Sequence, residues 1–107
     1  MSGGGGGPGP SIRNEDEPSC ADLVITTHIA SPVPAVISTL SKGDLLTITV
    51  ASITGPIQVV TSGGKLAGSV ISKDQARLLS CINGGTEYEA EVLSIKGGNC
   101  QIQIRST

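Results

Sequence analysis

The sequence predicts a mainly β fold, a small six-stranded barrel of the OB or SH3 kind. One well-defined helix is expected at about residues 73–83 and a short second helix at about residues 33–41. Short segments of alternating apolar and polar residues recur along the chain, and glycine-rich turns separate them. Ile, Val, Leu and Thr are abundant and Tyr88 is the only aromatic residue, which favours a core of branched aliphatic side chains. A chain of 107 residues is long enough for one such core.

The N-terminal segment differs in composition from the rest of the chain. Residues 1–19 contain glycine, proline and acidic residues and almost nothing to bury, so we expect a disordered tail before a single barrel domain at 20–107. The barrel domain carries equal numbers of acidic and basic side chains, and therefore no net charge to attract a polyanion. Neither a signal peptide nor a run of about 18 apolar residues is visible, so no membrane span is expected.

The first half of the barrel domain is predicted to hold two strands joined by a helical turn. Residues 20–30 alternate, with Leu23 and Ile25 facing the core, and the prolines that follow end this strand. The short helix at 33–41 is predicted by apolar residues at spacings i, i+3, i+4 and i+7, namely Val33, Val36, Ile37 and Leu40. Residues 44–53 form the longest predicted strand.

Residues 57–82 are predicted to form a strand, a glycine turn, a second strand and the main helix in succession. Ser62-Gly63-Gly64 supplies the turn, because glycine adopts positive φ without a steric penalty. The return strand at 65–71 is expected to alternate, with Leu66, Gly68 and Val70 on one face and Lys65, Ala67, Ser69 and Ile71 on the other. Gly68 interrupts it, which predicts a bulge or the close approach of another backbone.

The main helix is predicted by its two ends and its apolar face. Ser72 and Gln75 match a capping box, in which the serine oxygen accepts from the amide three residues on and the glutamine reaches back. Asn83-Gly84-Gly85 ends the helix, since glycine takes the left-handed cap readily. The predicted apolar face consists of Ala76, Leu78, Leu79 and Ile82.

The C-terminal hairpin contains a register conflict that predicts a β-bulge. If Gly97-Gly98 is the turn, regular pairing places Glu91 opposite Ile104 and therefore on the apolar face. An extra residue near Val92–Leu93 removes this conflict, and such bulges also bend strands into a barrel.

Groups that could carry out chemistry are few in this chain. His28 is the only histidine and no nucleophile motif is present, so we expect no enzyme activity, no bound metal and no cofactor. Cys20, Cys81 and Cys100 form no C-x-x-C pair, and no signal peptide is visible. We therefore expect three reduced thiols and a cytoplasmic location, with Cys81 and Cys100 packed as small apolar side chains.

Two sets of charged residues are candidates for binding. Glu87, Glu89 and Glu91 recur at intervals of about 6.5–7 Å along one face of a predicted strand. They form either a solvated face that limits wrong strand pairing, or a docking strip for a basic partner or a weak divalent-metal site. Candidates for phosphate contacts are Lys65, Lys73, Arg77 and Arg105, and the sequence leaves open whether they share a surface.

The second half of the chain, about residues 56–105, resembles HIRAN domains. The matching positions are Val59-Val60, Gly64, 66–71, 76–81, Gly85 and 88–92. The resemblance implies a small barrel that binds single-stranded or damaged DNA ends, although the aromatic residues that would stack on bases are absent. We therefore expect a non-catalytic module that acts through a protein partner, with HIRAN-like binding of DNA ends as the alternative.

Overall fold

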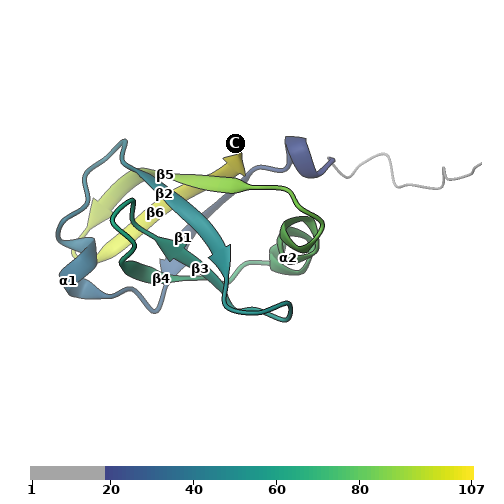
Figure 1. Ribbon diagram of the computed structural model, residues 1–107. Helices are drawn as coiled ribbons and strands as arrows, with labels where there is room; N and C mark the ends of the chain where they lie inside the picture. The colour runs from purple at the N-terminus through teal and green to yellow at the C-terminus, as the bar shows by residue number, and fades with distance from the viewer. Residues whose placement is uncertain (1–18) are drawn as a thin grey trace, which may run out of the picture.

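The structure is a computed structural model that describes residues 19–107, in which six antiparallel strands close into a barrel (Figure 1). In chain order the strands are β1 (Ile25–Ala30), β2 (Leu45–Val50), β3 (Ile57–Val60), β4 (Leu66–Val70), β5 (Tyr88–Lys96) and β6 (Asn99–Ser106). Their order around the barrel is β1–β4–β3–β2–β5–β6. Within the described residues, three helical segments accompany them, η2 (Cys20–Asp22), α1 (Pro34–Ile37) and α2 (Gln75–Asn83). The predicted six-stranded barrel with one main helix is confirmed.

Two further predictions concern the N-terminal tail and the absence of a membrane span. The predicted tail at 1–19 lies outside the described residues, apart from Ser19. Within the described residues, no helix has both the length and the apolar character needed to cross a bilayer.

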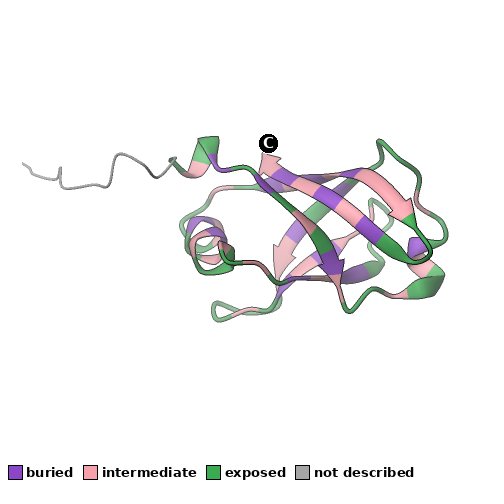
Figure 2. Cartoon of the chain, turned by 180° about the vertical axis from the view of Figure 1, so that it is seen from behind, coloured by how far each residue is buried: buried purple, intermediate pink, exposed green. Residues whose placement is uncertain are grey.

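Aliphatic side chains from all six strands and from both α-helices fill the barrel. The alternation is clearest in β6, where Cys100, Ile102 and Ile104 are fully buried and the residues between them are half-exposed (Figure 2). The six largest fully buried side chains are Leu78, Ile102, Ile104, Val59, Val92 and Cys100. Five of these six are Leu, Ile or Val, and Tyr88 also lies in the core, so the core is mainly aliphatic, as the composition predicted.

The predicted bulge in the C-terminal hairpin is confirmed. Val92 pairs with Ile102, whereas Ser94 pairs with Gln101, so Leu93 is the extra residue on β5. The shift keeps Val92 in the core and places Glu91 opposite Gln103 on the outer face. The apolar pattern of the two strands therefore determined the register.

A second bulge lies where Gly68 predicted one. Val59 pairs with Gly68 but Val60 pairs with Leu66, so Ala67 is the extra residue on β4. Ala67 is consequently buried and Leu66 is 42% exposed. The prediction that Leu66 shares a face with the buried Val70, and that Ala67 lies on the other face, was wrong, because the bulge reverses the alternation before Gly68.

We expect Gly68→Ala to lower the free energy of unfolding by about 1–3 kcal/mol. A Cβ atom at position 68 would lie 2.6 Å from the carbonyl oxygen of Ala30, and a backbone oxygen cannot move aside easily. Gly63→Ala is the matched control, because Gly63 has no positive φ and its Cβ would meet Thr61 Oγ1 at 3.8 Å. Urea unfolding of both variants measures the difference, and equal stability would contradict the close approach.

Two strand boundaries differ from the prediction because local turns end the strands earlier. Residues 20–22 form η2, closed by a hydrogen bond from the Asp22 amide to the Ser19 carbonyl (3.0 Å), so β1 begins only at Ile25. β2 stops at Val50, since Ser52 begins a turn in which its carbonyl accepts from the Gly55 amide (2.9 Å). β5 rather than β2 is therefore the longest strand.

The short helix α1 covers only Pro34–Ile37 of the predicted 33–41. Ser38 Oγ donates to the Ala35 carbonyl (3.0 Å) and Thr39 Oγ1 to the Val36 carbonyl (2.7 Å). In a longer helix these two carbonyls would accept hydrogen bonds from backbone amides. Serine and threonine hydroxyl groups that bond to nearby backbone groups in this way favour the end of a helix.

The main helix α2 begins at Gln75, two residues later than predicted. Gln75 Oε1 accepts from the Ser72 amide (3.1 Å) as a capping box requires, but Ser72 Oγ accepts from the amide of Asp74 rather than Gln75 (2.9 Å). The glycine cap is as predicted: Gly85 has φ +106°, and the amides of Gly85 and Thr86 donate to Ile82 and Cys81 carbonyls.

The buried face of α2 is rotated relative to the predicted one. Leu78 and Cys81 are buried, Leu79 and Ile82 are half-buried, and Ala76 is exposed. The burial of Cys81 agrees with its expected packing as a small apolar side chain, although the predicted apolar face did not include it.

Candidate functional site

A groove of about 720 Å³ lies between the outer face of β2, the start of β5 and the C-terminal end of α2. We call it the β2–β5 groove. Its walls include Leu45, Thr47 and Thr49 from β2, Glu87 and Glu89 at the start of β5, and Ile82 from α2.

The local sequence explains why these side chains meet in the groove. In β2, Leu46 and Ile48 face the core, so their neighbours Leu45 and Thr47 face outward. Thr47 pairs with Glu89 across the strands, and directly paired residues share a face. The glycine turn after α2 then brings the chain back to β5 beside the same surface.

The predicted acidic row lies on the outer face at the start of β5, and part of it is neutralised. Arg105 lies opposite Glu89 on β6, with Nε at 3.4 Å from Glu89 Oε2 and Nη1 at 2.9 Å from Glu91 Oε1. The hydrogen bond to Glu91 raises the pKa of the Arg105 guanidinium. Glu87 is exposed beside this network, so the negative character is greatest at the groove end of the row.

The described lining of the β2–β5 groove contains two carboxylates, Glu87 and Glu89, and no lysine, arginine or histidine. The C-terminal end of α2 adjoins it through Ile82 and Gly85, and the C-terminal end of a helix carries partial negative charge. The groove is therefore suited to a cationic group rather than an anion.

The structure does not bring the four candidate phosphate ligands together. Lys65 lies in the β3–β4 turn beside α1, whereas Lys73 precedes α2 at the opposite end of the barrel (Figure 1). Arg105 pairs with the acidic row. Arg77 is half-buried on α2 and close enough to Tyr88 to affect its pKa: burial raises the pKa of the phenol, and the positive charge of Arg77 opposes that shift.

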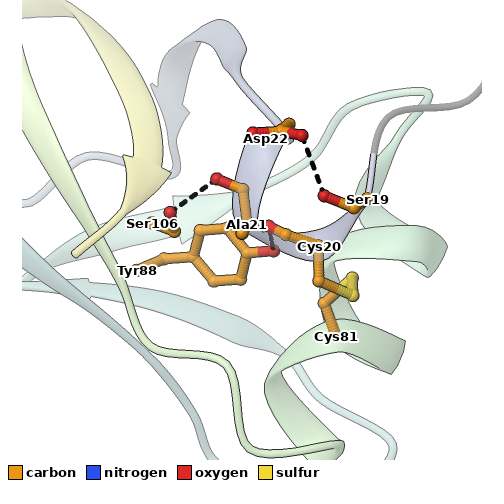
Figure 3. Close-up of a disulfide and its surroundings, with 7 residues drawn as sticks. All are labelled: Ser19, Cys20, Ala21, Asp22, Cys81, Tyr88 and Ser106. Atoms are coloured by element: carbon orange, nitrogen blue, oxygen red, sulfur yellow. Dashed lines mark hydrogen bonds between the residues drawn. A yellow bond between two sulfur atoms is a disulfide. The ribbon is translucent and has the colours of Figure 1, made fainter.

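The prediction of three reduced thiols was wrong, because Cys20 and Cys81 form a disulfide with Cα atoms 5.6 Å apart (Figure 3). The two cysteines are 61 residues apart in sequence. Their pairing depends on the barrel placing η2 against α2, and no spacing motif could have revealed it. Cys100 remains a free, buried thiol, and burial raises its pKa.

Two hydrogen bonds hold the same N-terminal segment, and we call Ser19–Asp22, which precedes the buried Leu23, the N-terminal strap. Tyr88 Oη donates to the Cys20 carbonyl (2.5 Å) and Ser106 Oγ to the Ala21 carbonyl (2.7 Å) (Figure 3). The single tyrosine of the chain thus serves as a hydrogen-bond donor to the strap, with its ring buried in the core.

The remaining chemical candidates do not form a site. His28 is exposed on β1, and no group of three His, Cys, Asp or Glu side chains in residues 19–107 is arranged to hold a metal ion. No protein-family model, curated protein or solved structure matches the chain. The fold defines a small closed β-barrel, and the resemblance to HIRAN domains stays a prediction.

Proposed function

We propose that this protein is a non-catalytic binding module that takes a short basic and apolar segment of a partner protein into the β2–β5 groove. The observation that carries the proposal is the lining of the groove, where the exposed Glu87 and the Arg105-paired Glu89 stand beside exposed aliphatic and threonine side chains. Complementary charge of this kind favours a cationic partner and disfavours an anionic one.

The apolar part of the groove supplies the second half of the recognition. Leu45 on β2 is 51% exposed, and Ile82 is half-buried at the α2 end of the groove. Aliphatic side chains of the partner would cover these two residues, while a neighbouring lysine or arginine would reach Glu87. The groove volume of about 720 Å³ lies within the usual range of about 300–1,000 Å³ for ligand sites.

Binding of DNA ends has less support. Phosphate recognition needs several basic groups on one surface, and Lys65 and Lys73 lie at opposite ends of the barrel while Arg105 pairs with carboxylates. A cytoplasmic location was expected because no signal peptide is visible, whereas the Cys20–Cys81 disulfide favours an oxidising compartment.

Selection from a random peptide display library on the wild-type protein tests the proposed function. We expect the enriched peptides to combine a lysine or arginine with an adjacent aliphatic residue. Thr47→Lys, which adds a positive charge inside the groove, should weaken binding of the best peptide by at least about tenfold. Thr26→Lys is the matched control, because Thr26 is also an exposed strand threonine, on β1 and outside the groove lining.

Fluorescence anisotropy measures the dissociation constants, with a single-stranded DNA oligonucleotide as the competing class of ligand. At physiological salt we expect the oligonucleotide to bind more weakly than about 10⁻⁵ M, in the non-specific range. Enriched peptides without basic residues, or equal effects of the two lysine substitutions, would contradict the proposed groove. Submicromolar binding of the oligonucleotide would favour the HIRAN-like alternative.

A further inference from the structure

We propose that the N-terminal strap is a redox-sensitive clasp that keeps the α2 end of the β2–β5 groove in its binding shape, and that a dithiol reductant releases it. This inference deepens the proposed function and rests on it for its binding readout. It is carried by three links between the strap and the barrel, each made at or next to the groove lining.

The three links converge on one end of the groove. The disulfide holds Cys81, whose chain neighbour Ile82 lines the groove. The Cys20 carbonyl accepts from Tyr88, which lines the groove directly. The Ala21 carbonyl accepts from Ser106, whose neighbour Thr107 also lines the groove. Figure 3 shows the disulfide and both hydrogen bonds around η2, so a movement of the strap reaches α2, β5 and β6 together.

The two hydrogen bonds to the strap depend on the disulfide, which keeps the strap against the barrel. A 3₁₀ turn of three residues has little stability of its own, and a neutral hydrogen bond contributes little net free energy. Tyr88 is only 2% exposed. If the strap moves away, its hydroxyl group loses the Cys20 carbonyl as acceptor and needs another hydrogen-bond partner. We therefore expect reduction to loosen the strap, Tyr88 and the end of α2 as one unit.

The release is an ordinary thiol–disulfide exchange. One thiolate of the dithiol attacks a sulfur of the pair, and Cys20 is the more exposed of the two. The S–S bond breaks, a mixed disulfide forms, and Cys81 leaves as a thiolate that takes up a proton. The second thiol of the reductant then displaces Cys20 and becomes part of its own disulfide. Two electrons and two protons pass from the dithiol to the protein.

Hydrogen–deuterium exchange with and without dithiothreitol tests the clasp without any ligand. We expect reduction to speed exchange at least tenfold in residues 19–22 and 75–86, so that they exchange faster than β2 and the centre of β6, which open only on global unfolding. Cys100→Ala is the matched control, because it retains the disulfide and should respond like the wild type. Cys20→Ser/Cys81→Ser should show the fast exchange with or without dithiothreitol.

The binding arm uses the best peptide from the display selection. We expect reduction to weaken its binding at least about tenfold in the wild type and in Cys100→Ala, and to leave the double serine variant unchanged. Ser106→Ala, which keeps the disulfide but lacks one hydrogen bond, is expected to remain folded and to exchange faster only in the strap.

Unchanged exchange in α2 after reduction, or uniform loss of protection throughout the barrel, would overturn the clasp. If no peptide binds the oxidised protein, the proposed function fails while the exchange arm still decides on the clasp.

Discussion

Replacing both Cys20 and Cys81 by serine is expected to lower the free energy of unfolding by about 4 kcal/mol relative to the disulfide-bonded protein. The disulfide joins residues 61 positions apart, and closing so long a loop removes much of the conformational entropy of the unfolded chain. A barrel of this size has a total stability of about 5–15 kcal/mol, so the variant should remain folded but unfold at a much lower urea concentration.

The free cysteine provides the control for this experiment. Dithiothreitol should destabilise the wild type and Cys100→Ala by the same amount, because Cys100 takes no part in the disulfide. It should leave the Cys20→Ser/Cys81→Ser variant unchanged. If the oxidised wild type and the double serine variant unfold at the same urea concentration, the disulfide does not stabilise the barrel.

Leu78→Ala is expected to lower the free energy of unfolding by about 2–5 kcal/mol, and Leu79→Ala by only about 1 kcal/mol. Leu78 is completely buried, at 0% exposure, and its truncation leaves a cavity in the core. Leu79 is half-buried at the edge of the core. Both residues lie in α2 and both changes are Leu→Ala, so any difference in helix propensity cancels between them.

Urea unfolding monitored by circular dichroism, under oxidising conditions, measures this pair. The comparison is sensitive to the rotation of α2 about its axis, because consecutive helical residues point about 100° apart. Equal costs for the two variants, or a larger cost for Leu79→Ala, would show that α2 presents a different face to the barrel. The apolar pattern in the sequence places both leucines on one face and therefore does not predict the difference.

Features that depend on a few neighbouring residues were determined by the sequence. The bulge at Leu93 followed from the conflict between the glycine turn and the apolar alternation of the last two strands. The glycine cap at Gly85 and the interruption at Gly68 followed from the backbone freedom of glycine. In each case the constraint lies within one hairpin or one helical turn, so it can be derived without knowing the rest of the fold.

Features that join distant parts of the chain were decided only by the tertiary structure. The Cys20–Cys81 disulfide, the bond from Tyr88 to the strap and the β2–β5 groove all need the barrel to close in its particular strand order. The acidic row is visible in the sequence, but its pairing with Arg105 depends on the register between β5 and β6. The physical reason is that alternation and turn residues act on neighbouring positions, whereas the order of strands around a barrel is determined by the packing of the whole core.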